Sequence, residues 1–162
     1  MLFVGVDGGG TRTRAVAVGE EGAVRAWAVA GAGNYQLIGR DGVSALLARL
    51  LAELGADASG EQLSLCVALA GAGRAAEQAD IGALVRARGW ARRVVVVSDA
   101  RAALEGAHGG RGGLIVIAGT GSMVLGKGDD GREVRAGGLG PLLGDEGSGY
   151  ALGLAALQAV LE

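Results

Sequence analysis

The sequence predicts an α/β domain built on a mixed β-sheet, and two patterns support this fold class. Residues 2–6, 12–18 and 23–30 are strand-like apolar segments separated only by short turns, so neighbouring strands must pair antiparallel. Residues 63–70 and 93–98 are continuous apolar runs typical of buried strands, and helical patterns alternate with them. The predicted order is three strands, helix, strand, helix, strand, helix, with the later strands added in parallel.

Three helices are predicted in the first part of the chain. The first covers residues 43–54 and ends at Gly55, because apolar residues recur there at the spacing of one helix face. These residues are Val43, Leu46, Leu47, Leu50, Leu51 and Leu54. A second helix covers residues 75–88 and ends at Gly89, and a short third helix covers residues 99–106.

A glycine-rich segment, residues 106–113, predicts a hinge between two lobes. We expect residues 1–110 to form a first lobe and residues 111–162 to form the start of an incomplete second lobe. The final helix, residues 148–161, is apolar on most of its faces, so it requires a neighbour that these residues do not supply. The expected neighbour is a second copy of the chain, giving a homodimer, or a missing second-lobe segment.

Two glycine-threonine turns repeat the same arrangement of strand, turn and strand. The first is Gly8-Gly9-Gly10-Thr11, and the second is Gly119-Thr120-Gly121-Ser122, between strands at residues 114–118 and 123–127. Such turns allow backbone N–H groups and a hydroxyl to approach phosphate oxygens without interference from side chains. Either turn alone is equally compatible with a purely structural hairpin. Two of them flanking a hinge predict a nucleotide clamp.

Two aspartates at the ends of predicted strands are candidates for the chemistry. Asp7 precedes the first glycine turn, where it can orient Mg²⁺ through water. Asp99 follows the strand at residues 93–98, at the edge where open α/β sheets bind ligands, and can accept the proton of an attacking hydroxyl. The alternatives are an incidental acid at Asp7 and a helix N-cap at Asp99. Locally, Asn34 is a turn residue and Asp145 a helix-capping charge.

Composition argues against several classes of function. Lys and Arg total 15 and Asp and Glu total 17, so the sequence predicts no basic surface for nucleic acid or an anionic membrane. No apolar run reaches the roughly 18 residues of a membrane span, and the first residues lack a signal-peptide pattern, so a cytoplasmic protein is expected. The single cysteine, Cys66, and the tryptophans Trp27 and Trp90 are expected in the core.

Five ordered motifs resemble those of the BadF/BadG-type ATPases, in particular the N-acetylglucosamine and glucosamine kinases of that family. The motifs are Val-Asp-Gly-Gly-Gly-Thr at 6–11, Gly-Asn at 33–34, Val-Ser-Asp-Ala at 97–100, Gly-Thr-Gly-Ser at 119–122 and Gly-Asp-Glu-Gly-Ser at 144–148. The resemblance implies an actin-like ATPase (ribonuclease H-like) lobe, ATP and Mg²⁺ as cofactors, and a small-molecule sugar substrate.

The same resemblance implies a role for each matching residue. The residues implied to contact the ATP phosphates are Thr11 and Thr120, with Gly8, Gly9, Gly10, Gly119 and Gly121 of their turns. The residues implied to bind the sugar are Asn34, Asp99, Ser122, Gly138, Leu139 and Asp145. Asp99 is also implied to be the base that acts on the 6-hydroxyl. Those kinases have Trp where this chain has Leu139 and Asn where it has Met123, so the choice of sugar stays open.

Three functions therefore stand as hypotheses. The first is the N-terminal portion of an ATP-dependent kinase that phosphorylates the 6-hydroxyl of N-acetylglucosamine, glucosamine or a related hexose. The second is a non-catalytic sugar-binding or regulatory module, which would bind sugar without ATP. The third is an activator ATPase of the same family, whose members hold an iron–sulfur cluster with cysteines at a dimer interface.

Overall fold

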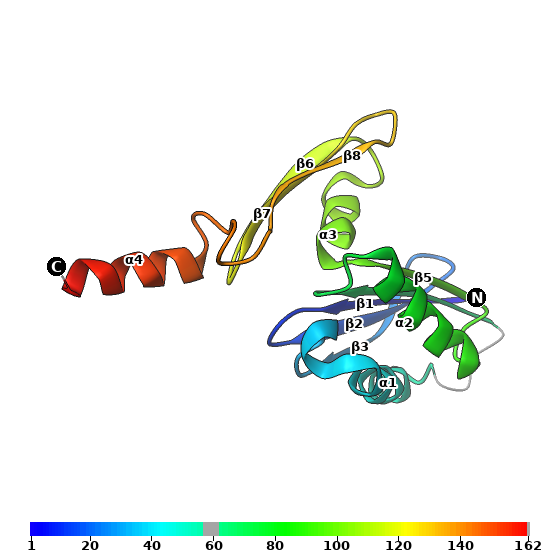
Figure 1. Cartoon of the computed structure of the whole chain (residues 1–162). Helices are drawn as coiled ribbons and strands as arrows, with labels where there is room; N and C mark the ends of the chain where they lie inside the picture. The colour runs from blue at the N-terminus through cyan, green and yellow to red at the C-terminus, as the bar shows by residue number, and fades with distance from the viewer. Residues whose placement is uncertain (57–61, 162) are drawn as a thin grey trace. The chain divides into compact units, whose positions relative to one another are not determined.

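The computed structural model describes residues 1–56 and 62–161. Contacts divide the chain into two compact units, Met1–Ala102 and Ala103–Glu162. This division falls a few residues before the lobe boundary expected at 110/111, which remains a prediction. The first unit contains the predicted succession of three strands, helix, strand, helix, strand and the start of a helix, so the predicted order is confirmed (Figure 1).

A five-stranded mixed sheet forms the centre of the first unit. Its strands are β1 (Leu2–Gly8), β2 (Thr13–Gly19), β3 (Val24–Ala30), β4 (Leu63–Leu69) and β5 (Arg93–Ser98). The strand order is β3-β2-β1-β4-β5. β1 to β3 pair antiparallel, whereas β4 lies parallel to both β1 and β5. Both predicted pairing modes are therefore correct, and the carboxyl ends of β1, β4 and β5 share one edge of the sheet.

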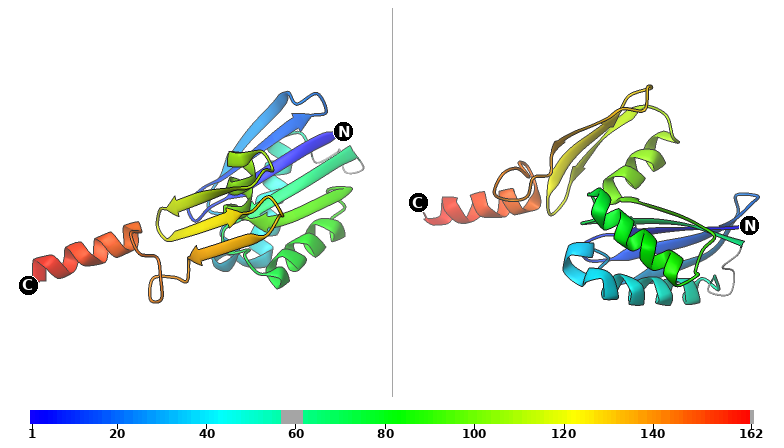
Figure 2. Two further views of the ribbon diagram at one scale, coloured as in Figure 1. Left: turned by 90° about the horizontal axis from the view of Figure 1, so that it is seen from above. Right: turned by 45° about the vertical axis from the view of Figure 1, so that its right-hand side comes forward.

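Helices α1 (Tyr35–Glu53) and α2 (Ala75–Ala87) cover one face of this sheet (Figures 1 and 2). The leucine stripe of α1 packs against the inward side chains of β1 and β4, as the helical spacing predicts. The largest fully buried side chains of this core are Val4, Val43, Leu47, Leu50, Leu51, Leu63, Leu65, Val67, Leu69, Ile81 and Val85.

The other face of the sheet exposes several apolar side chains, which corrects two expectations about the core. Trp27 is 67% exposed, and Cys66 is also exposed, although both were expected to be buried. Successive side chains of a strand point to opposite faces, so a continuous apolar run is fully buried only where both faces are covered. Neighbouring groups still desolvate the Cys66 thiol enough to raise its pKa. Trp90 is partly buried against the core.

Helix α1 begins eight residues earlier than the apolar spacing predicts. Asn34 is its N-cap, and Gly39 interrupts the helix with a φ of 63° and a ψ of −176°. The helix therefore consists of one short turn, a break and a long amphipathic segment. The spacing of leucines marks only the long segment, because the first turn does not continue the same buried stripe.

The second unit contains a three-stranded antiparallel sheet and a final helix. Its elements are β6 (Gly113–Ala118), β7 (Ser122–Lys127), β8 (Glu133–Gly137) and α4 (Gly149–Leu161), and the strand order is β6-β7-β8. The sequence did not predict β8 as a strand, because this short segment is largely polar and exposed. Helix α4 has no buried residue, consistent with its predicted need for a neighbour. Among the described residues, no helix is both long enough and apolar enough to span a membrane.

Helix α3 (Asp99–His108) crosses the division between the units and runs two residues beyond its predicted end. The glycine-rich segment that follows is tied to the second unit. The Lys127 Nζ donates to Glu105 Oε1 at 2.6 Å and to the Gly110 carbonyl at 3.0 Å. The His108 Nε2 also lies 3.1 Å from the Leu114 carbonyl. These bonds fix the end of α3 beside β6 and β7.

Candidate functional site

The residues implied to form the site fall into two groups, one in each compact unit. The first group comprises Asp7, Gly8, Gly9, Gly10, Thr11, Asn34 and Asp99. The second comprises Gly119, Thr120, Gly121, Ser122, Gly138, Leu139 and Asp145. The geometry of each group follows from its own unit.

The turn between β1 and β2 presents open backbone at its tip. The Gly9 amide donates to the Arg12 carbonyl at 2.9 Å, which closes the turn. A Cβ on Gly10 would meet no atom within 4 Å, and Thr11 is exposed, so a phosphate has room beside this backbone. Gly8 has a different role, because it is buried and a Cβ there would lie 3.2 Å from Gly33 Cα. Gly8 thus allows the end of β1 to approach the loop at Gly33.

Asp7 and Asp99 lie at the same edge of the sheet. Asp7 is exposed near the end of β1, where its neighbours in register are Arg14 of β2 and Ala68 of β4. Asp99 directly follows β5, and β4 separates β5 from β1. Two strand spacings correspond to about 10 Å between the backbones of β1 and β5. Residues at this one edge of the sheet can therefore contact both a nucleotide phosphate and an attacking hydroxyl.

The N-terminus of α3 shows that Asp99 does not cap this helix. The Ser98 Oγ accepts a hydrogen bond from the Arg101 amide at 3.2 Å, which is the bond of an N-cap residue. Asp99 is already in the helix, and its Oδ1 accepts the adjacent Ala100 amide at 2.9 Å. This bond leaves the second carboxylate oxygen, Oδ2, outside the helix-capping arrangement. The alternative that Asp99 is only an N-cap is therefore wrong.

The loop that carries Asn34 is held against the first glycine turn. The Gly33 amide donates to the Gly9 carbonyl at 2.8 Å. The buried Thr13 donates from its Oγ1 to the Gly31 carbonyl, also at 2.8 Å. The structure therefore brings Asn34 close in the fold to the predicted phosphate-binding backbone. The sequence did not identify Thr13 as a site residue. Its only signal is that it is polar at a strand position where the pattern of the strand places apolar side chains.

In the second unit, the β6–β7 turn is joined to the loop before α4. The Asp145 Oδ1 accepts the Ser122 amide at 3.1 Å, and the Ser122 Oγ donates to the Glu146 carbonyl at 2.7 Å. The Gly149 amide donates to the Gly119 carbonyl at 2.8 Å. These three bonds place the predicted phosphate turn and two predicted sugar ligands in one local structure.

Asp145 is not a capping residue of α4, although its position in the sequence suggested one. The helix begins at Gly149, and the Ser148 Oγ accepts the Ala151 amide at 3.1 Å. Asp145 is buried and has a φ of 63°, the only positive value among the described non-glycine residues. Buried polar groups held in this sparsely populated conformation are concentrated at functional sites.

The remaining residues of the second group lie around this structure. Thr120 is exposed, and a Cβ on Gly119 would meet no atom within 4 Å. Gly138 has a φ of 67°, and a Cβ there would lie 3.0 Å from the Cβ of Met123. Leu139 follows with 66% of its surface exposed. Met123, one of the two positions that depart from the N-acetylglucosamine kinases, therefore lies beside Gly138, the residue that precedes the other such position, Leu139.

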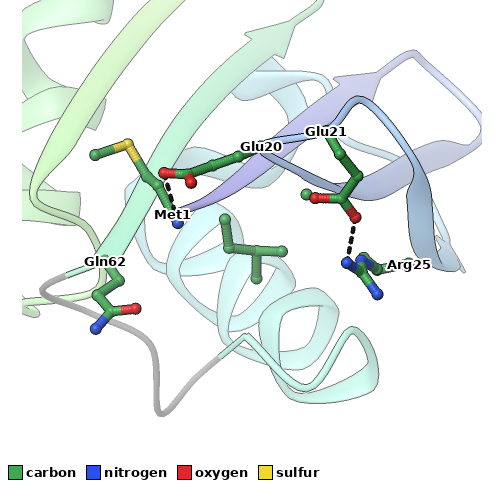
Figure 3. Close-up of a pocket in the computed structure, with 7 residues that line it drawn as sticks. Met1, Glu20, Glu21, Arg25 and Gln62 are labelled. Atoms are coloured by element: carbon green, nitrogen blue, oxygen red, sulfur yellow. Dashed lines mark hydrogen bonds and ion pairs between the residues drawn. The ribbon is translucent and has the colours of Figure 1, made fainter.

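A hollow in the first unit is separate from these residues (Figure 3). It has a volume of about 350 Å³ and is lined by Met1, Leu2, Gly19, Glu20, Glu21, Arg25 and Gln62. The amino group of Met1 pairs with Glu20 at 2.9 Å there. Because Leu2 faces Gly19 and Gly8 faces Thr13, this hollow lies at the opposite end of β1 from the glycine turn.

The described residues include no cluster of three or more His, Cys, Asp or Glu side chains that could hold a metal ion. Asp7 is the carboxylate that immediately precedes the first glycine turn. Mg²⁺ keeps several waters and commonly uses one or two carboxylates together with nucleotide phosphates. The exposed Asp7 and the open turn next to it fit that mode of binding.

The chain is similar to known ATPases and sugar kinases over nearly its whole length. Residues 4–162 match the model of the BadF/BadG/BcrA/BcrD ATPase family. The chain is 36% identical to an N-acetylmuramic acid/N-acetylglucosamine kinase of Clostridium acetobutylicum, over 98% of this chain and 53% of the relative. It is also 36% identical to a glucosamine kinase of Vibrio cholerae, over 98% of this chain and 54% of the relative.

A solved structure shares the fold. It is a candidate N-acetylglucosamine kinase from Chromobacterium violaceum, with a TM-score of 0.77 and 31% identity, covering 97% of this chain and 55% of that one. The chain thus spans about half the length of the curated relatives it matches. The expected actin-like ATPase lobe is confirmed by this likeness and by the mixed sheet.

Proposed function

The chain belongs to the BadF/BadG/BcrA/BcrD ATPase family, and from that premise we propose that it carries the first lobe and the opening of the second lobe of an ATP-dependent sugar kinase. The proposed substrate is an amino sugar, N-acetylglucosamine or glucosamine, or a related hexose. The proposed reaction transfers the γ-phosphoryl group of ATP to the sugar 6-hydroxyl, giving ADP and the sugar 6-phosphate. The cytoplasm is the proposed location.

The position of Asp99 carries this proposal. Ser98 caps α3, and Asp99 at the carboxyl edge of the sheet bonds the first turn of the helix through Oδ1 alone, which leaves its Oδ2 for a substrate hydroxyl. A carboxylate at this edge can accept the proton of a sugar hydroxyl as its oxygen attacks phosphorus. Because phosphoryl transfer depends mainly on positioning and charge stabilisation, one well-placed base is sufficient side-chain chemistry.

The glycine turns have the groups needed to hold phosphates. The open backbone at Gly10 offers an N–H group, and the exposed hydroxyls of Thr11 and Thr120 offer O–H donors, whereas the Gly119 amide already donates to the Gly121 carbonyl at 2.9 Å. Asp7 would hold Mg²⁺ through water. When bound, the ion supplies positive charge that stabilises the negative phosphate oxygens.

The sugar-side residues leave the choice of amino sugar open. Asn34, Ser122 and Asp145 offer hydrogen bonds to hydroxyls, whereas Leu139 offers an exposed aliphatic surface. An aliphatic side chain does not provide the flat aromatic contact that Trp would give to a sugar ring. We therefore propose both N-acetylglucosamine and glucosamine as substrates to be tested.

The test measures ADP formation and sugar 6-phosphate formation in the same preparation. Purified chain is mixed with ATP, Mg²⁺ and each sugar, and ³¹P NMR follows ADP and sugar 6-phosphate. The proposal expects sugar-dependent formation of both products, either by the chain itself or after addition of the remaining second-lobe residues of the Clostridium acetobutylicum relative. ATP hydrolysis that no sugar stimulates would contradict it. Sugar binding with no turnover in either preparation would indicate a binding module instead.

A further inference from the structure

A chain of hydrogen bonds connects Asn34 to helix α2. The Asn34 Oδ1 accepts the backbone amide of Gln36 at 2.9 Å. The Gln36 side chain then donates from its Nε2 to Glu77 Oε1 at 2.6 Å and to the Gly71 carbonyl at 2.9 Å. The loop before α1 is therefore fastened to the loop and helix that follow β4.

This network determines which atoms Asn34 can present to a ligand. The backbone amide of Gln36 is a donor, so it selects the carbonyl oxygen of the Asn34 side chain as its partner. The Asn34 Nδ2, with its two N–H groups, remains for other contacts. Asn34 thus serves as a hydrogen-bond donor, and its proper partner is a sugar hydroxyl or carbonyl oxygen.

Glu77 is a firm anchor for Gln36. Its side chain is only 12% exposed, and its Oε2 accepts the Arg74 amide at 2.8 Å. Glu77 is the N3 residue of α2 in this capping arrangement, so its position is set by the helix. One oxygen of the Glu77 carboxylate holds the helix end, and the other holds Gln36.

Gly71 shows how closely the two loops approach. It has a φ of +75°, and a Cβ there would collide with the Asn34 Oδ1 and lie 2.9 Å from Gln36 Cγ. The Tyr35 amide also donates to the Ala70 carbonyl at 2.9 Å. Only glycine at position 71 leaves space for the Asn34 side chain in this orientation.

A second link holds the same short helical turn. The Tyr35 hydroxyl donates to Asp80 Oδ2 at 2.8 Å, and Arg40 forms an ion pair with Asp80. Gly39 separates this turn from the long part of α1. The turn that follows Asn34 is therefore held by α2 on both sides of the helix break.

We propose that Gln36 and Glu77 are positioning residues for sugar binding: they hold Asn34 with its two N–H groups directed to the sugar. This inference rests on the proposed function, because it assigns Asn34 to the sugar. It adds a donor role for the Asn34 side chain and two residues that contact no substrate themselves. Loss of the Gln36–Glu77 bond therefore weakens sugar binding without touching the sugar.

An exchange of side chains between positions 36 and 77 tests the link. In Gln36→Glu, a carboxylate faces both Glu77 and the Gly71 carbonyl, so acceptors oppose acceptors with almost no change in size. In the double variant with Glu77→Gln, the new amide at position 77 donates to the new carboxylate at position 36, and its oxygen still accepts the Arg74 amide. The carboxylate at position 36 continues to face the Gly71 carbonyl, so the rescue is partial. Gln62→Glu, at the opposite end of β4, and Glu53→Gln, on the exposed side of α1, are matched controls.

Two measurements on the 162-residue chain give the result. Calorimetric titration with N-acetylglucosamine and with glucosamine gives affinity, and NMR amide exchange at residue 36 reports its bond to Asn34 without any sugar. We expect Gln36→Glu to weaken sugar affinity about tenfold and to accelerate amide exchange at residue 36 about tenfold. A tenfold change corresponds to the loss of about one hydrogen bond. Relative to Gln36→Glu, the double variant should bind sugar at least about threefold more tightly and exchange the amide of residue 36 at least about threefold more slowly. The controls should behave as the unaltered chain.

Several results would overturn the proposal. Unchanged exchange in Gln36→Glu means that the bond does not hold Asn34, whatever the sugar affinity. Faster exchange with unchanged sugar affinity removes the positioning role alone and leaves the proposed function intact. Absence of sugar binding both by the unaltered chain and by the chain completed with the second-lobe residues contradicts the proposed function and the positioning role together. If Gln36→Glu does not fold, the double variant is compared with Gln36→Ala instead. A double variant that folds, but has no slower exchange at residue 36 and no higher sugar affinity than Gln36→Ala, also overturns the proposal.

Discussion

The Asp145 carboxylate accepts the Ser122 backbone amide, with 3.1 Å between Oδ1 and N. This bond joins the loop before α4 to the β6–β7 turn, although 23 positions separate the two residues in the sequence. Asp145 adopts a φ of 63° to make it. The proposed phosphate turn and sugar ligand thus form one structural unit, so a change at either residue affects both.

Replacing Asp145 separates its structural role from its charge. Asn tolerates a positive φ and keeps an acceptor oxygen, whereas Ala does neither. We expect Asp145→Ala to lower the free energy of unfolding by about 1–3 kcal/mol and Asp145→Asn by less than about 1 kcal/mol. Urea unfolding followed by circular dichroism measures both. Equal losses in the two variants would show that the Ser122 bond contributes little.

Gly121 and Gly119 form a matched pair of substitutions in one turn. A Cβ at Gly121 would lie 3.0 Å from Asp145 Oδ2, whereas a Cβ at Gly119 meets nothing within 4 Å. Gly121→Ala should therefore lower the free energy of unfolding by about 1–3 kcal/mol, because the Asp145 loop must move. Gly119→Ala should have a much smaller effect in the same urea titration. The opposite order would mean that the carboxylate does not occupy this position.

Asp99→Asn should abolish the proposed proton transfer while preserving the fold. The amide still offers an oxygen to the Ala100 amide, and Ser98 still caps α3. We expect sugar 6-phosphate formation to fall at least about 100-fold, as is usual when a general base is removed. The measurement is the rate of ADP release in the preparation that turns over, with Asp41→Asn on α1 as the control. Activity within about tenfold of the unaltered protein would contradict the assignment of Asp99 as base.

Tyr35 should make the free energy of unfolding fall as the pH becomes alkaline. Its hydrogen bond to Asp80 raises the pKa of the phenol above its ordinary value near 10. The folded state holds this proton more tightly than the unfolded state, so the stabilisation is complete below about pH 10 and is lost as pH rises through the folded pKa. Absorbance titration of Tyr150→Phe, in which Tyr35 is the remaining tyrosine, measures this pKa. Asp80→Asn should shift it back toward its ordinary value, and an identical titration curve would contradict the role of Asp80.

Helix α4 should make the free chain self-associate. Its apolar side chains are exposed, including Leu154 at 46%, Leu157 at 65% and Leu161 at 86%. Exposed apolar surface of this kind favours association between copies. Sedimentation velocity over a range of concentrations should show dimers or larger species, and Leu157→Gln with Leu161→Gln should reduce them. A monodisperse monomer at high concentration would contradict this expectation.

Local patterns were sufficient to predict most of the fold. The turns at 8–11 and 119–122 and the leucine stripe of α1 are short-range signals, because turn chemistry and helical spacing act within a few residues. The first turn of α1 and strand β8 were missed. Gly39 breaks the helical spacing in one case, and the exposed, polar β8 lacks an apolar pattern in the other.

The candidate site was harder to predict from the sequence because two potential capping residues lie within a few positions of each other before each of two helices. Ser98 and Asp99 are both good N-caps, and so are Ser148 and Asp145 near the start of α4. In each case the structure assigns the cap to serine. Neither Asp99 nor Asp145 is therefore the N-cap of the helix that follows it, which the residue types alone could not indicate.

By itself, the sequence determined the order of strands and helices, the two glycine turns and the family, because these depend on local spacing and ordered motifs. Only the tertiary structure decided which sheet face is covered, which residues cap α3 and α4, and how Asn34 is held. The Gln36–Glu77 bond joins residues 41 positions apart, and Cys66 is exposed because it lies on the sheet face that α1 and α2 do not cover. Such contacts depend on how distant segments pack, and local propensity carries no information about that packing.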